Sequence, residues 1–211
     1  MRLVPMRQLD REQLIRKAEG FIQWLDRQID GLEVTADLRP RLAAGCLEMA
    51  LEHQKAIVLL IAKNLHGSAF ALVRPLFETY VRGLWLHRCA TDADLGKFVK
   101  GQDIGKFGDL CAAVERLDGF KDGVLSDVKE RSWSAMSGFT HTGMEQIARR
   151  YTEETIEANY DEGEILEALN FACGIGWLAA IAICDLAGNV ELANTVLEKV
   201  QELFPARETR T

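Results

Sequence analysis

The feature that most constrains the fold is one long apolar segment, residues 68–90, which reads SAFALVRPLFETYVRGLWLHRCA. Although it is mostly apolar, it carries Arg74, Glu78 and Arg82 at four-residue steps. With 3.6 residues per turn, this spacing places all three charged side chains on one face of an α-helix, with Trp85 close to the same face. The segment therefore predicts a central helix with a charged stripe on an otherwise apolar surface.

The rest of the chain shows the same helical pattern, and no run alternates with the period of two that a strand requires. We expect an all-α fold: a single-domain bundle (residues 1–211) of about seven to nine helices. Ser68 is expected to cap the central helix and Pro75 to kink it, which frees a backbone carbonyl nearby. The other helices are predicted at residues 10–30, 35–65, 92–100, 104–117, 124–137, 144–151, 161–186 and 190–204.

Composition favours a cytoplasmic protein. Of its 211 residues, 48% are hydrophobic and 27% charged, as in soluble globular proteins. The formal net charge of -7 argues against broad, non-specific nucleic-acid binding. The polar N-terminus does not resemble a signal peptide, and the longest apolar run, residues 171–184, is shorter than a membrane span needs. The five cysteines stand singly and are expected to be buried free thiols.

The charged stripe has two interpretations. Two guanidinium groups flanking a carboxylate could bind an anion, with Glu78 orienting the guanidinium groups of Arg74 and Arg82. Alternatively, Arg74, Glu78 and Arg82 form a structural ion network that locks the helix against its neighbours. Spacing alone leaves both interpretations open.

Among the four histidines, His141 is the best candidate for proton transfer, because it stands in SGFTHTG (residues 137–143), a short segment of small polar residues. The alternative is a helix-end histidine whose backbone is hydrogen-bonded. His53 lies on an apolar helix face and is either a core residue or part of a ligand site. None of the histidines forms HxxxH or HExxH, so no metal site and no cofactor are expected.

Two further motifs are weighed. The run Arg149-Arg150-Tyr151 at a predicted helix end could contact a phosphate or stack on a base, or it is simply a solvated helix end. The run GIGWLA at residues 174–179 matches the dinucleotide fingerprint GxGxxA. No strand precedes it, so we interpret its small residues as positions of close helix packing.

Two family resemblances follow from these motifs. The spacing from Arg82 to His87 resembles the Arg-x4-His motif of HEPN proteins, a helical superfamily that includes metal-independent ribonucleases. On one straight helix these two residues point about 140° apart. A longer pattern resembles a bacterial all-helical family of unknown function, and it comprises EH (52–53), SAF (68–70), LVRP (72–75), Glu78, Arg82, Trp85, THTG (140–143) and RR (149–150). The second resemblance implies that the central helix and the His141 segment form one unit, and it implies no activity.

We therefore carry two hypotheses. In the favoured one, this is a binding or interaction protein. Either a polar pocket lined by Arg74, Glu78, Arg82 and His141 holds a small anionic ligand, or the stripe only stabilises the fold. In the alternative, it is a HEPN-like ribonuclease or toxin-type enzyme that acts on nucleic acid. Arg82 or Arg74 would then stabilise developing charge, and His141 or His87 would move the proton. Apolar residues remaining on the first and last helices favour a homodimer.

Overall fold

A computed structural model describes residues 9–205, and over these residues the chain is all-helical, with no strand. This confirms the fold class. The elements are α1 (Arg11–Ile29), α2 (Leu38–Ala62), α3 (His66–Arg88), α4 (Asp92–Val99), α5 (Phe107–Val114), α6 (Val124–Thr140), α7 (Met144–Ile147), the 3₁₀ helix η1 (Ala148–Arg150), α8 (Glu162–Leu186) and α9 (Val190–Leu203).

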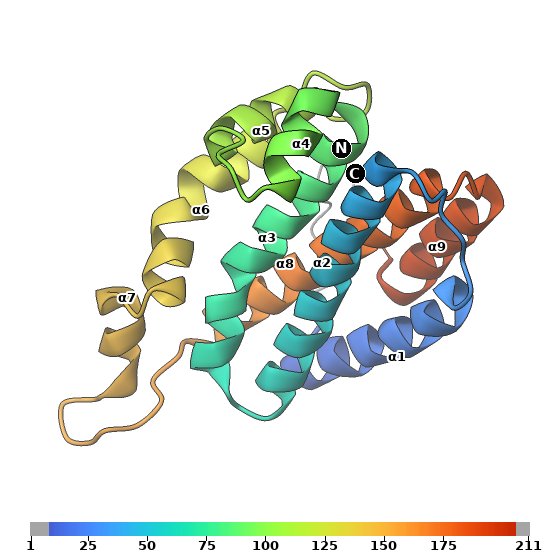
Figure 1. Ribbon diagram of the computed structural model, residues 1–211. Coiled ribbons are helices and arrows are strands. Elements are labelled where there is room, and N and C mark those ends of the chain that lie inside the picture. The colour runs from blue at the N-terminus through green and yellow to red at the C-terminus, as the bar shows by residue number, and fades with distance from the viewer. Residues whose placement is uncertain (1–8, 206–211) are drawn as a thin grey trace.

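The centre of the molecule is formed by α2, α3 and α8, which run alongside one another (Figure 1). α1 and α9 cover one side of this centre, and α5 and α6 cover α3 on the other side. Every α-helix except α7 contributes buried apolar side chains to one continuous core. Because α3 contacts helices on both sides, its remaining polar face is the stripe that carries the three charges.

The central helix continues through Pro75 without a break. Proline has no amide hydrogen, so the carbonyl four residues earlier, that of Ala71, has no intrahelical donor. The Thr140 hydroxyl of α6 lies 3.2 Å from the Ala71 carbonyl oxygen and 2.8 Å from the Met136 carbonyl oxygen. A hydroxyl has one hydrogen to donate, so these two carbonyl oxygens share it. The expectation of a freed carbonyl is thus met, and the group that reaches it comes from the neighbouring helix.

Two glycines mark the closest helix approaches in the bundle centre. A Cβ atom on Gly83 would lie 2.7 Å from the Leu47 side chain, so glycine is what lets α3 pack directly on α2. A Cβ atom on Gly176 would lie 2.0 Å from the buried amide of Gln54. Gly176 belongs to the GIGWLA run, which lies inside α8. This placement supports the interpretation of that run as a packing site.

α8 is the most apolar helix, and among the described residues it is the one segment long and apolar enough to cross a membrane. Of its most apolar 18-residue window, 56% is buried inside the structure. Asp161 caps its start by accepting hydrogen bonds from the backbone of Gly163 and Glu164. Such burial by α2, α3 and α9 is typical of the core helix of a soluble protein.

Several predicted helix boundaries are wrong. α2 and α5 are each three residues shorter at both ends than the predicted ranges 35–65 and 104–117. α3 begins at His66 with Leu65 as its N-cap residue, so Ser68 lies inside the helix instead of capping it. α6 continues to Thr140, beyond the expected end at residue 137, because Met136 and Phe139 are buried against the core. The helix expected at residues 144–151 is instead a single α-turn, α7, followed by η1.

Candidate functional site

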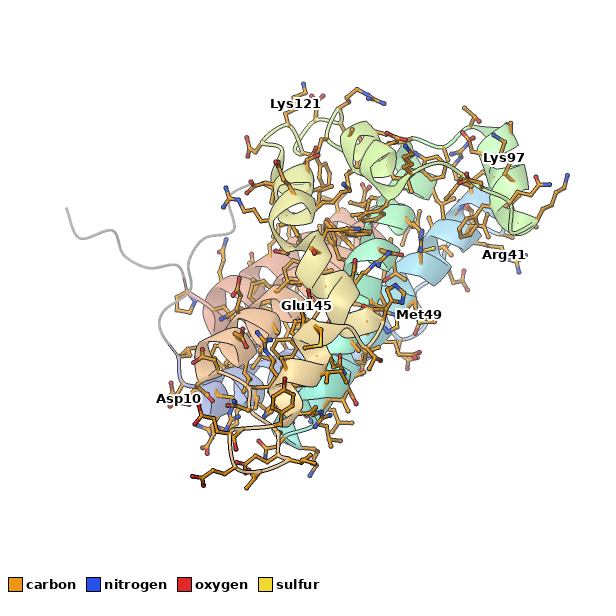
Figure 2. The ribbon with its side chains drawn as sticks, turned by 90° about the vertical axis from the view of Figure 1, so that its left-hand side faces the viewer. Asp10, Arg41, Met49, Lys97, Lys121 and Glu145 are labelled. Atoms are coloured by element: carbon orange, nitrogen blue, oxygen red, sulfur yellow. The ribbon has the colours of Figure 1, made fainter. Side chains whose placement is uncertain are left out.

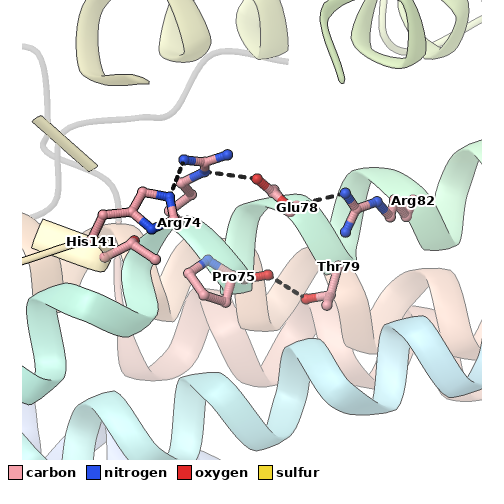
Figure 3. A pocket seen from close by; sticks show the side chains of 7 residues that line it. Arg74, Pro75, Glu78, Thr79, Arg82 and His141 are labelled. Atoms are coloured by element: carbon pink, nitrogen blue, oxygen red, sulfur yellow. Dashed lines mark hydrogen bonds and ion pairs between the residues drawn. The ribbon is translucent and has the colours of Figure 1, made fainter. Parts of the chain in front are cut away.

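The three charged residues of α3 form one connected ion network. Arg74 Nε donates to Glu78 Oε1 at 2.8 Å, and Arg82 Nη2 lies 3.0 Å from Glu78 Oε2 (Figure 3). The Glu78 side chain is only 15% exposed, whereas Arg74 is 21% and Arg82 36% exposed. The carboxylate therefore occupies the inner position and holds the two guanidinium groups apart on consecutive turns.

A matching polar face comes from α6. Trp133, Ser137 and His141 follow one another at four-residue steps, and all three contact Arg74. The Arg74 guanidinium carbon lies 4.2 Å from the Trp133 ring centre, its Nη1 donates to Ser137 Oγ at 3.0 Å, and the same Nη1 lies 3.3 Å from His141 Nε2. The structure thus brings His141 into contact with the stripe on α3.

The hydrogen bonds of His141 follow from the chemistry of arginine. A guanidinium has donors only, so a hydrogen bond between these two nitrogens requires Nε2 to act as the acceptor, with a ring proton on Nδ1. The His141 amide also donates to the Ser137 carbonyl and ends α6. His141 is thus a helix-end residue whose ring lies in the charged cluster, and its role in proton transfer stays a prediction.

These side chains line an open pocket of about 200 Å³. The lining residues are Arg74, Pro75, Glu78, Thr79, Arg82, Thr140 and His141. Hydrogen bonds to described residues occupy Arg74 Nε and Nη1 and leave Nη2 unused, while Arg82 contacts Glu78 through Nη2 alone. The pocket is therefore lined by arginine donors that have no acceptor among residues 9–205.

The HEPN-like pair is not brought together. Arg82 belongs to the pocket, whereas His87 Nε2 lies 3.4 Å from Asp185 Oδ2 of α8. Burial lowers the pKa of His87, partly offset by Asp185. α3 is one continuous helix through Gly83, so the side chains of Arg82 and His87 keep the separation of about 140° expected for residues five apart on a helix.

Trp85 and His53 also lie outside the pocket. Trp85 is 7% exposed and belongs to the apolar core. His53 is half-buried on α2, where burial lowers its pKa. Both residues therefore have surroundings typical of structural positions.

The Arg149-Arg150-Tyr151 run is divided among three environments. Arg149 forms a two-pronged ion pair with Glu164 and packs over the Phe139 ring. The Arg150 guanidinium packs against Gly67, where a Cβ atom added to the glycine would lie 2.7 Å from Arg150 Nη2. The Tyr151 side chain is 48% exposed. None of these three side chains lines the pocket.

Sequence reasoning missed Trp133 and Ser137. Their four-residue spacing to His141 was a usable signal, but only if the predicted helix had been extended past residue 137. All five cysteines are free, and burial raises the pKa of Cys111 and Cys173 to about 12, so both are neutral thiols. Within the described part of the chain, no group of three or more histidine, cysteine or acidic side chains could hold a metal ion.

Comparison with known proteins places the chain in a family. Residues 47–207 match the family of unknown function DUF6988. The chain belongs to this family. The match includes α3, α6 and all the pocket residues, in agreement with the resemblance to a helical family of unknown function. No curated protein and no solved structure matches the chain.

Proposed function

We propose that the protein binds a small organic anion in the pocket between α3 and the end of α6. The observation that supports this most directly is the set of unused donors on Arg74 and Arg82, which face a pocket of about 200 Å³. Guanidinium groups held in place by a carboxylate need little reorganisation to receive an anion, which lowers the entropic cost of binding.

The lining narrows the chemistry of the ligand. Two arginines and one glutamate give the pocket a formal charge of about +1, which suits a small anion with one or two negative charges better than a polyanion. Pro75 gives the pocket an apolar wall, and the hydroxyls of Thr79 and Thr140, which also line it, are directed to backbone carbonyl oxygens. A carboxylate or phosphate monoester with a short apolar group satisfies both parts.

The test is ligand-induced stabilisation of the full chain. Acetate, butyrate, inorganic phosphate and phenyl phosphate would each be titrated while the thermal midpoint is recorded. A ligand at a hundred times its Kd stabilises by about 2.7 kcal/mol. We expect butyrate or phenyl phosphate to raise the midpoint more than acetate or inorganic phosphate, and Arg82→Gln to abolish the effect.

Arg131→Gln provides the matched control. Arg131 is an exposed arginine of α6 whose ion pair with Asp127 lies outside the pocket lining. It removes the same charge as Arg82→Gln and should leave the ligand effect intact. Equal losses in the two variants, or no shift with any of the four anions, would refute the pocket.

We do not favour the ribonuclease alternative, because Arg82 and His87 contact different elements. A cytoplasmic location and a homodimer remain proposals. The location is supported by the core position of α8, and the dimer by Val190 and Leu197, which are 70% and 42% exposed on α9. Light scattering on the full chain tests the dimer directly, and a monomeric mass would remove it.

A further inference from the structure

The acidic charge of the chain is concentrated in one segment. Residues 144–164 carry seven acidic side chains and two arginines, so they account for five of the seven net negative charges. Within this segment, α7, η1 and the following loop (residues 144–160) form an arm that projects from the helical body (Figure 1). The arm itself carries four glutamates and two arginines, and three of the glutamates lie together at residues 153–157. Figure 2 shows Glu145, at the start of this arm, on the outer surface of the molecule.

The arm is held in a defined shape by its own hydrogen bonds. Asn159 donates its amide to the Arg149 carbonyl at 2.9 Å and so closes the base of the loop. At the tip, the Thr152 amide donates to the Thr155 carbonyl at 2.8 Å, and the Thr155 hydroxyl donates to Glu157 at 2.7 Å. The side chains on the arm are therefore presented from a folded loop.

Large apolar side chains are exposed along this acidic arm. Ile156 is 93% exposed, Met144 66%, Tyr151 48% and Ile147 41%. No ion pair to a described residue engages Glu153, Glu154 or Glu157, and these three glutamates surround Ile156 in the sequence. Single exposed apolar residues are ordinary, but four within one short ordered arm indicate a surface that a partner covers.

The charge of the arm selects among kinds of partner. An anionic membrane surface or a nucleic acid would be repelled by the glutamates at the tip. A second copy of this chain would bring the same negative charge. A cationic amphipathic helix, by contrast, offers lysines to the glutamates and apolar side chains to Ile156 and Met144, the latter a residue type that adapts to varied partners.

We infer that the arm, residues 144–160, docks a cationic amphipathic helical segment of another protein. Ile156 supplies the apolar anchor, and Glu153, Glu154 and Glu157 supply the charge complementarity that orients the helix and accelerates its association. This surface does not include the pocket on α3, and the inference stands independently of the anion proposal.

The test uses the full chain and a synthetic 18-residue helical peptide composed of leucine and lysine, with an amphipathic order. Its Kd would be measured by fluorescence anisotropy and its site mapped by amide chemical shifts. We expect shifts confined to the arm and a weakening of at least tenfold in Ile156→Ser. The triple variant Glu153→Gln, Glu154→Gln, Glu157→Gln should weaken binding similarly and remove most of its salt dependence.

Matched variants remove equal charge and equal apolar surface elsewhere. The triple variant Glu19→Gln, Glu191→Gln, Glu198→Gln neutralises three exposed glutamates of α1 and α9, and Val190→Ser replaces an apolar residue that is 70% exposed. Both should leave the Kd within about threefold of wild type. Equal weakening by these controls, shifts spread over the whole surface, or no binding at all would overturn the inference.

Discussion

At the residue scale, substitutions of Glu78 and Arg82 should differ in their effect on stability. Glu78→Gln should lower the free energy of unfolding, whereas Arg82→Gln should mainly affect ligand binding. Glu78 is the inner member of the network, so Glu78→Gln leaves two partly buried guanidinium groups without their shared counter-charge. Removing one partner of a fully buried pair costs about 3–5 kcal/mol, and partial exposure reduces this to about 1–3 kcal/mol. Arg82→Gln should cost less than about 1 kcal/mol, because the side chain is 36% exposed.

Urea denaturation of the two variants measures this difference. Arg131→Gln, which breaks an exposed pair on α6, gives the baseline for a surface arginine. A Glu78→Gln variant as stable as wild type would show that the stripe contributes nothing to the fold, and the structural interpretation of the network would be wrong.

Thr142, next to His141, adopts a backbone conformation that suits glycine. Its φ is +55°, in the left-handed region where a β-branched side chain is strained by about 1–2 kcal/mol. Because its side chain is exposed, Thr142→Gly should raise the free energy of unfolding by about 0.5–1 kcal/mol, even after the entropic cost of glycine. The denaturant midpoint reports this change.

Asn64 is the matched control, since its φ is +57° and asparagine tolerates the left-handed region better than threonine does. Asn64→Gly should therefore stabilise less than Thr142→Gly. If Thr142→Gly instead destabilises the protein, the threonine side chain makes a favourable interaction that outweighs its backbone strain.

At the element scale, the contact between α2 and α3 depends on Gly83. An added Cβ would lie 2.7 Å from Leu47 Cγ and 3.4 Å from the Ala43 carbonyl, so Gly83→Ala should force the helices apart. Overpacking of this kind typically costs about 1–3 kcal/mol. Thermal or urea unfolding should show this loss in the variant.

Gly45 on α2 tests whether steric contact is the cause. It is also a glycine inside a helix, but no atom lies within 4 Å of its added Cβ. Gly45→Ala should stabilise by up to about 1 kcal/mol, because alanine is the better helix former. The two substitutions are chemically identical and should have opposite signs; the same sign in both would refute the close-packing explanation.

The elements also show what the sequence could reveal. The predicted ranges agree well with the structure for α1, α4, α8 and α9. In the structure, all four helix starts are capped by side chains that accept backbone hydrogen bonds: Asp10, Thr91, Asp161 and Asn189. The end of α6 was mispredicted, because small polar residues at 137–140 suggest a loop while tertiary burial of Phe139 against Phe70 keeps them helical. That error concealed the alignment of Trp133, Ser137 and His141 opposite Arg74.

At the scale of the whole molecule, local sequence patterns contain no information on the distance between α3 and α6. Arg74, Glu78 and Arg82 could be placed together by local spacing, since they share one helix. The approach of His141 to Arg74 depends on how two helices separated by α4 and α5 pack, and local periodicity carries no such information. The family resemblance associated the two segments, but only the packed structure supplies the 3.3 Å contact.

The packing of the whole chain also predicts a loss of stability in mild acid. Burial lowers the pKa values of His53, His66 and His87. For His66, which is 8% exposed, the nearby Arg11 and Arg150 lower the pKa further and Glu162 partly offsets them. Below the ordinary pKa of about 6.5, the unfolded chain therefore binds protons that the folded chain does not.

Because the unfolded chain takes up these protons, the free energy of unfolding rises with pH between the lowered histidine pKa values and about pH 6.5. Stability should be greatest above about pH 6.5 and should fall as the pH drops toward the lowered histidine pKa values. Urea unfolding between pH 5 and 8 measures the slope. Most carboxylates have ordinary pKa values of about 4, below this range, so the slope reports mainly the histidines.

His66→Gln should reduce this slope, because it removes the most buried of the three histidines with lowered pKa values. His141→Gln is the control, since the His141 side chain is exposed at the pocket surface. A profile that is flat from pH 5 to 8, or a slope that His66→Gln leaves unchanged, would mean that His66 takes up its proton without unfolding. The start of α3 would then have to accommodate a cationic ring beside Arg11 and Arg150, which the buried, unpaired Nδ1 of His66 argues against.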